Sequence, residues 1–113
     1  MQLITPLTRE DVYAVINDHS VRLSVPDHTV RQRTLRKARH DFPGKIELDD
    51  HIHIIGFLIK SVYKSHAGFY TLIYYNRSIF VYHASSKHGA WMPFSHFPGL
   101  LTELKTGVEV KHG

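Results

Sequence analysis

The chain has 113 residues, of which 42% are hydrophobic and 21% charged, and it carries a formal net charge of +4 with a pI near 9.5. This length suits a single globular domain over residues 1–113, and the lack of cysteine excludes disulfides, thiolate metal sites and cysteine nucleophiles. The first residues lack a basic segment followed by a long apolar one, so the sequence predicts neither secretion nor membrane insertion. We therefore expect a cytoplasmic protein that makes no membrane contact.

The first predicted element is a helix near residues 8–19. Thr8 can cap this helix, and Asp11 falls in its first turn, where the helix dipole favours an acid. Apolar side chains follow at helical spacing at Val12, Val15 and Ile16. Residues 20–26 alternate apolar and polar side chains, which fits either a short strand or an extended connection, and we favour the connection.

A basic amphipathic helix is predicted next, from a cap at Asp27 or Thr29 to a stop before Pro43, which disfavours helical geometry in the preceding residue. At 100° per residue, one arc of this helix carries Val30, Thr34, Leu35, Ala38 and Phe42. The opposite arc carries Arg33, Arg36, Lys37, Arg39 and His40, while Arg31 lies toward the apolar side. Such a helix can bury one face and present a positive stripe to an anionic partner.

Strands are predicted from residue 45 onward, where β-branched and aromatic residues alternate. Residues 45–49 and 51–63 read as one or two strands, and residues 69–75 and 78–84 form the clearest hairpin, joined at Asn76 and Arg77. A two-residue turn pairs Tyr74 with Ile79, Leu72 with Val81 and Tyr70 with His83 on one face, and Ile73 with Phe80 and Thr71 with Tyr82 on the other. Both faces are largely apolar, so we expect the amphipathic helices on one face, and the C-terminal segment or a binding site on the other.

The C-terminal part is predicted to contain an ordered loop over residues 85–96 and a last helix over residues 98–105, with Gly107 just beyond its end. The fold class is therefore α+β, with two N-terminal helices followed by an antiparallel sheet of about three to five strands and a short C-terminal helix.

The arginine-rich stripe favours nucleic-acid binding, because guanidinium groups grip phosphates through two parallel hydrogen bonds and stack on bases. Strand tyrosines can add stacking platforms for unpaired bases. The residues expected to bind nucleic acid are Arg31, Arg33, Arg36, Lys37, Arg39, His40, Tyr70, Tyr74 and Tyr75. We expect a small regulatory protein, of a size typical of phage or mobile elements, that prefers RNA or single strands over duplex DNA and uses no cofactor.

A catalytic alternative comes from the histidines. Asp49, His51 and His53 alternate along an extended segment, where they can act as acid and base, but no third fixed ligand is identifiable and we assign no metal. The order of elements and the segment FYTLIYYNRSIFVYHASSKHG resemble the small RelE/HigB-type ribonuclease toxins, with Thr71 where many members carry an arginine. The resemblance implies metal-independent mRNA cleavage by Lys87, His83 or His88 with tyrosine support.

A third hypothesis is a protein-interaction module or inhibitor whose basic helix docks on an acidic partner surface. A homodimer is compatible with each hypothesis and would double the basic stripe across a two-fold axis.

Overall fold

The computed structural model describes residues 7–42, 44, 46–49 and 51–108. In chain order the elements are α1 (Arg9–Asp18), β1 (Arg22–Ser24), α2 (His28–Asp41), β2 (Ile55–Ile59), β3 (Gly68–Tyr75), β4 (Ser78–His83), β5 (His88–Pro93), a 3-10 turn (Phe94–His96) and α3 (Phe97–Thr106). The α+β class and an antiparallel sheet of five strands are confirmed, and the order of elements is roughly as expected, except that β1 lies between the two N-terminal helices.

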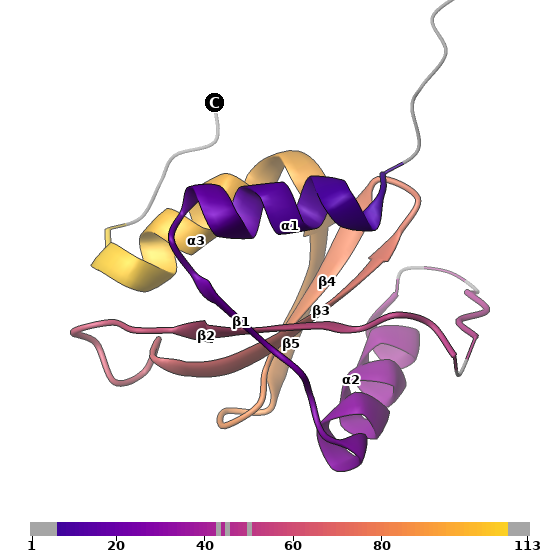
Figure 1. Ribbon diagram of the computed structural model, residues 1–113. Coiled ribbons are helices and arrows are strands. Elements are labelled where there is room, and N and C mark those ends of the chain that lie inside the picture. Colours follow the sequence, from indigo (N-terminus) through magenta and orange to yellow (C-terminus); the bar gives the residue numbers. More distant parts are fainter. Residues whose placement is uncertain (1–6, 43, 45, 50, 109–113) are drawn as a thin grey trace, which may run out of the picture.

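The sheet is a five-stranded antiparallel meander in which each strand pairs with the next along the chain, in the order β1-β2-β3-β4-β5. The helices α1 and α3 lie together on one face of this sheet, and α2 lies on the other (Figure 1). The sequence had suggested the amphipathic helices on one face and the C-terminal segment or a binding site on the other. The difference arises because β1, an edge strand of the sheet, connects α1 to α2. The chain passes from one face of the sheet to the other along this edge.

The central hairpin has the register expected from the sequence. Asn76 and Arg77 form a two-residue turn, and Asn76 has a φ of 56°, which this kind of turn requires and asparagine tolerates. Tyr70 lies opposite His83, and Thr71 lies opposite Tyr82. The alternation places Leu72, Ile79, Val81 and Tyr70 in the core beneath α1 and α3, and Ile73, Phe80 and Tyr82 in the core beneath α2.

Two strands differ from the sequence-based expectation. Residues 20–26 contain β1, whose Leu23 lies opposite Phe57 of β2, and residues 85–96 contain β5 rather than only a loop. β5 contains no β-branched residue, and at one position it packs tightly over Phe80. A Cβ added at Gly89 would lie 2.4 Å from the Phe80 ring, so only glycine fits at that point of the strand.

In the segment before β2, an expected strand is missing. Residues 46–49 and 51–54 were expected to form strands, but the structure assigns no strand to them. Lys45 and the Pro43 stop signal lie outside the described residues. Leu48 and Ile54 are buried against the α2 core, and Arg39 and Arg31 donate hydrogen bonds to the carbonyls of Leu48 and Ile52. The apolar residues of this segment therefore cover α2 instead of extending the sheet.

The position of α2 on the sheet is fixed by two polar contacts. The Trp91 Nε1–H of β5 donates to the carbonyl oxygen of Ala38 at 2.9 Å, near the C-terminal end of the helix. At mid-helix, the fully buried hydroxyls of Thr34 and Thr71 lie 2.7 Å apart. Thr34 also donates to the carbonyl of Val30 at 2.7 Å, and a carbonyl can only accept. Thr71 must therefore be the donor in the pair of threonines.

This assignment predicts unequal effects of two isosteric substitutions. Thr34→Val leaves the buried Thr71 hydroxyl without its acceptor and should lower the free energy of unfolding by about 1–3 kcal/mol. Thr71→Val removes a donor, while Thr34 keeps its bond to the Val30 carbonyl, so its cost should be smaller. Urea unfolding of both variants and of the double variant measures these losses, and a larger loss for Thr71→Val would reverse the assignment.

Candidate functional site

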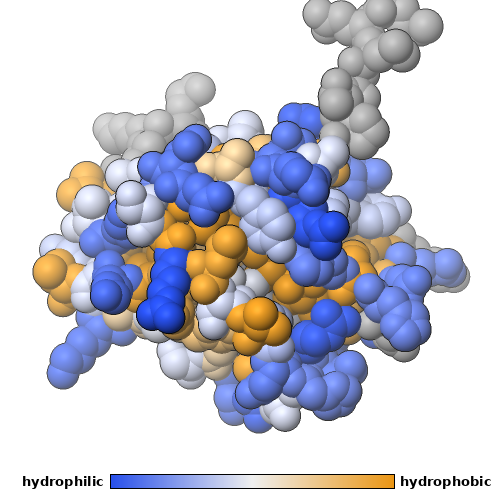
Figure 2. Space-filling view, in the orientation of Figure 1, coloured by the Kyte–Doolittle hydropathy of each residue, from blue (hydrophilic) through white to orange (hydrophobic). Residues whose placement is uncertain are grey.

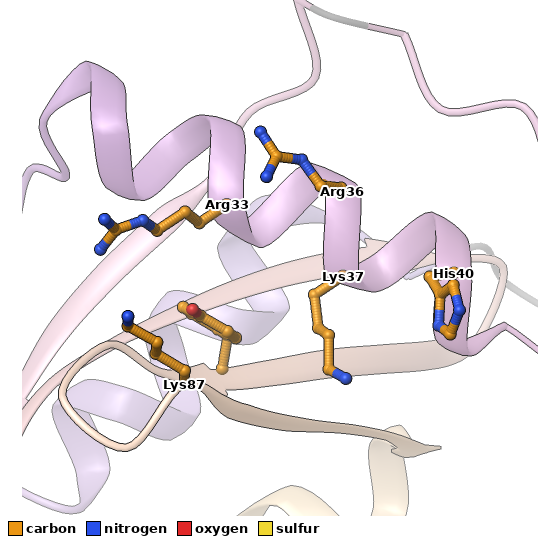
Figure 3. Close-up of a pocket in the computed structure, with 6 residues that line it drawn as sticks. Arg33, Arg36, Lys37, His40 and Lys87 are labelled. Carbon is orange, nitrogen blue, oxygen red and sulfur yellow. The ribbon is translucent and has the colours of Figure 1, made fainter.

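A basic groove separates α2 from the turn between β4 and β5. It encloses about 470 Å³ and is lined by Arg33, Arg36, Lys37, His40, Tyr82 and Lys87. Figure 3 shows four of these side chains on α2 and Lys87 on the opposite wall, with His40 and Lys87 toward opposite ends. None of the described residues that line the groove is acidic.

Helical spacing brings the four α2 side chains to one flank of the helix. Positions 33, 36, 37 and 40 repeat at intervals of three and four residues, which places them along one side. Thr34, Leu35 and Ala38 are buried on the sheet side and fix how the helix is rotated. The basic flank is therefore a consequence of the apolar positions between the cations.

The opposite wall is set by the β4–β5 turn. The Lys87 amide donates to the carbonyl of His83 at 2.9 Å, and Lys87 has a φ of 60°, a left-handed conformation that costs energy for a residue with a Cβ. Tyr82 comes from β4, is only 3% exposed, and lies between the walls. The turn thus holds a lysine across from the helix at some conformational cost.

Three cations of the groove are not neutralised by neighbours. The side chains of Arg33, Arg36 and Lys87 make no hydrogen bond or ion pair with any other described residue. Charged side chains on an ordinary solvated face usually mix signs, so unpaired cations on two facing walls are typical of an anion-binding surface.

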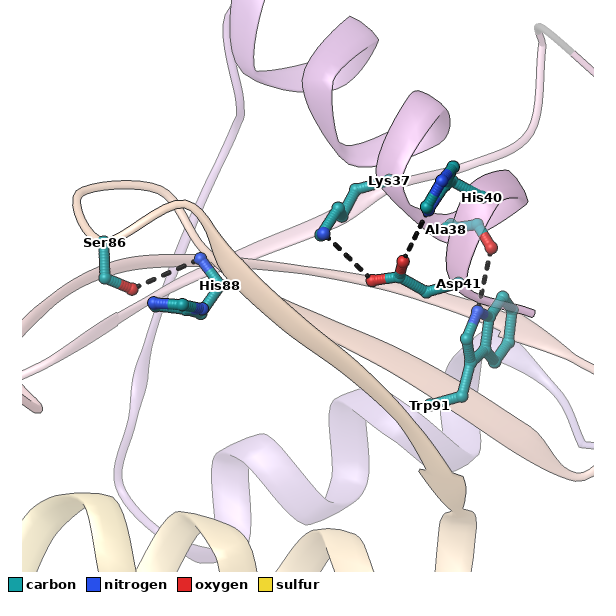
Figure 4. A network of polar contacts seen from close by, with 7 residues as sticks. All are labelled: Lys37, Ala38, His40, Asp41, Ser86, His88 and Trp91. Carbon is teal, nitrogen blue, oxygen red and sulfur yellow. Dashed lines mark hydrogen bonds and ion pairs between the residues drawn. The ribbon is translucent and has the colours of Figure 1, made fainter. Parts of the chain in front are cut away.

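The other two side chains of α2 in the groove, His40 and Lys37, share one carboxylate. Asp41 lies 2.9 Å from Nδ1 of His40 and 3.4 Å from Nζ of Lys37, as Figure 4 shows. The hydrogen bond from His40 is the main cause that lowers the pKa of Asp41, and Lys37 lowers it further against the opposing effect of burial. Asp41 therefore remains ionised and holds both side chains at the end of the groove.

The structure separates the predicted cations into two groups. Arg33, Arg36, Lys37 and His40 line the groove together. Arg31 and Arg39 lie on the other flank, where they bind the backbone carbonyls of the segment before β2. Those two arginines contribute to packing of that segment rather than to the groove.

The three predicted tyrosines do not line the groove. Tyr70 is 4% exposed, and its ring is stacked between Phe57, with centroids 5.5 Å apart, and His83, with centroids 4.3 Å apart, so both ring faces are covered. Tyr74 is half-buried against the core beneath α1 and α3. Tyr75 is half-buried on the α2 side and meets the Phe42 ring edge-on. Thr71, at the arginine position of the RelE/HigB-type resemblance, is fully buried.

The histidines named as alternative catalytic groups also lie outside the groove. The Nε2 of His53 is 2.8 Å from the Tyr13 hydroxyl, and burial, followed by Arg9 and Arg31, lowers its pKa. His51 is exposed beside Asp49. Within the described ranges no group of three His, Asp or Glu side chains could hold a metal ion.

His83 is held by contacts of both ring nitrogens. Its Nε2 lies 3.1 Å from the carbonyl of Ala67 and 2.9 Å from the Ser85 hydroxyl, and Nδ1 lies 3.1 Å from the Ser86 hydroxyl. Because the carbonyl only accepts, Nε2 carries the proton. His83 and His88 line a separate, mostly apolar hollow of about 210 Å³ on the side of α3.

Other surface features do not extend the groove. Figure 2 shows apolar side chains gathered below α1, over β1 and β2, and Leu23 and Val25 there are 41% and 91% exposed. The hollow at this place, about 300 Å³, has no lysine or arginine among its described lining residues. None of the described helices is long and apolar enough to cross a membrane.

Sequence reasoning missed Tyr82 and Asp41 as parts of the site and reached Lys87 only through a family resemblance. The hairpin register places Tyr82 on the face opposite Tyr70. This register would have been enough to predict Tyr82 as a groove residue if the sequence had also shown that α2 covers the same face of the sheet. Comparisons with protein-family models, curated proteins and solved structures give no match.

The contacts at Asp41 predict how its titration responds to substitution. His40→Ala should raise the pKa of Asp41 more than Lys37→Ala does, because the bond from His40 contributes most to its lowering. Carboxyl-detected NMR titration measures both changes. The pKa of Asp11, lowered mainly by its contacts with Thr8, should stay the same in both variants. An equal or larger response to Lys37→Ala contradicts this account.

Proposed function

We propose that the protein binds a single strand of nucleic acid, preferably RNA, in the basic groove. The observation that supports the proposal best is that Arg33, Arg36 and Lys87, on the two walls of the groove, have no polar partner within the described part of the chain. A cytoplasmic location fits this role, because nucleic acid is abundant there and the chain contains no cysteine.

The identity of the cations favours phosphate as the bound group. Arginine binds phosphate oxygens through two parallel hydrogen bonds, and Arg33 and Arg36 stand one turn apart on α2. Lys87 and Lys37 add point charges that tolerate variation in the path of a backbone. Several cations along one groove suit a chain of phosphates better than one small anion.

The second wall favours a single strand over a duplex. The major groove of B-DNA is about 12 Å wide, which a helix with its side chains already fills. Arg33 and Lys37 extend from α2 on the side of the β4–β5 hairpin (Figure 3), so this side of the helix cannot enter a major groove without the hairpin meeting the duplex. A single backbone needs space for one row of phosphates only.

The buried Tyr82 predicts little sequence preference. At 3% exposure its ring offers no face on which a base could stack, although the residue lines the groove. Recognition would then rest on the backbone and depend strongly on salt, since each neutralised phosphate releases counterions.

A salt series tests this proposal directly. Fluorescence anisotropy of labelled single-stranded RNA, single-stranded DNA and duplex DNA should give the highest affinity for RNA and a steep loss of affinity with salt. Tighter binding of the duplex would contradict the single-strand assignment. Lack of binding to all three at low salt would contradict the proposed function and favour an acidic protein partner.

Charge reversal locates the binding surface. Arg33→Glu combined with Arg36→Glu should weaken RNA binding by at least tenfold and lower the salt slope by roughly one unit for each lost phosphate contact. The matched control is Lys60→Glu with Lys64→Glu, which changes the net charge equally at exposed positions of the β2–β3 connection. Equal losses in the two double variants would show attraction by net charge alone.

A further inference from the structure

We propose that the groove also cleaves the RNA strand it binds, with the His40 imidazole as the general base that removes a proton from a ribose 2′-hydroxyl. The inference rests on the proposed function, because the strand must first lie between the two walls. It makes RNA the substrate class, since DNA lacks the attacking hydroxyl.

The contacts of His40 hold it in the form that a base requires. Its Nδ1 lies 2.9 Å from Oδ1 of Asp41, and an ionised carboxylate can only accept a hydrogen bond. In the neutral ring the proton is therefore on Nδ1, and Nε2 carries the lone pair. The His40 side chain is 82% exposed and lines the groove, so a bound strand can reach the ring.

Asp41 stands at a place where a carboxylate is otherwise unfavourable. It is the last residue of α2, and the carbonyl end of a helix repels negative charge. Its ion pair with Lys37 and its bond with His40 offset that repulsion. The arrangement of a carboxylate, an imidazole and an accessible second nitrogen makes Asp41 a positioning residue for His40.

The reaction transfers the phosphorus centre from the 5′ oxygen to the neighbouring 2′ oxygen. His40 Nε2 takes the 2′-hydroxyl proton while the 2′ oxygen bonds to phosphorus, and the bond from phosphorus to the 5′ oxygen breaks. The leaving 5′ oxygen takes a proton from solvent water, which reaches the exposed His40 end of the groove. The hydroxide left by that water takes the proton from His40 Nε2, which restores the side chain, and the products are a 2′,3′-cyclic phosphate and a 5′-hydroxyl.

The groove supplies the other requirements of this step. Lys87 lies toward the opposite end of the groove from His40 (Figure 3), so it can hold a neighbouring phosphate of the same strand while His40 acts on the next one. Arg36 and Lys37 are one turn or less from His40 on the same helix, where they can stabilise the charge that develops on the phosphate oxygens. His83 is less suited, because both of its ring nitrogens are engaged within the fold.

The test separates binding from cleavage. Labelled RNA is incubated with the wild-type protein and with His40→Gln, and products are analysed on denaturing gels and by mass spectrometry for the cyclic phosphate. Loss of a general base should slow cleavage by about 100-fold to 10,000-fold. Binding is measured on fully 2′-O-methylated RNA, which cannot be cleaved by this route, and should change little. The control is His28→Gln, a substitution of an exposed histidine at the other end of α2, and it should cleave at the wild-type rate.

Asp41→Asn tests the positioning role. It should lower kcat with little change in KM, because Arg33, Arg36 and Lys87 make no hydrogen bond or ion pair with Asp41 and stay in place, whereas a merely structural loss would weaken binding as well. Tight binding of methylated RNA without cleavage of normal RNA overturns the inference and leaves the proposed function standing. Cleavage by His40→Gln at the wild-type rate also overturns it. Failure to bind methylated RNA instead overturns the proposed function.

Discussion

The packing of α2 against the sheet is the constraint on which the rest of the molecule depends. The bond between Thr71 and Thr34 fixes the middle of the helix, and the bond between Trp91 and Ala38 fixes its end. Together they set the rotation of α2 and so decide which cations face the β4–β5 turn. A rotation of the helix by one residue, about 100°, would direct a different set of side chains into the groove.

Much of the fold follows from local sequence pattern. The Thr8 cap, the Asp27 cap and the two-residue turn at Asn76 each involve short-range contacts that a sequence shows directly. The elements that the sequence does not reveal depend on distant partners. β1 has three residues and needs β2 beside it, and β5 needs Phe80 beneath Gly89. β5 lacks the alternation of β-branched residues by which strands are recognised, and the alternation around β1 fits an extended connection equally well.

The candidate site shows the same division. The arc of Arg33, Arg36, Lys37 and His40 is visible from helical periodicity, because one element supplies it. Lys87 joins it only through the tertiary fold, and Tyr70 moves away from it because its ring fills the space between Phe57 and His83. A side chain on one face of a strand can be buried in the core or exposed to solvent, and the sequence of the strand alone does not distinguish these two environments.

The two walls of the groove are far apart in the sequence, because one is formed by residues 33–40 and the other includes Lys87. An anion held between them therefore cross-links α2 to the hairpin through its own charge. Since the unfolded chain cannot offer both walls at once, the polyanion binding proposed above would be linked thermodynamically to folding, so the free energy of unfolding would rise with polyanion concentration.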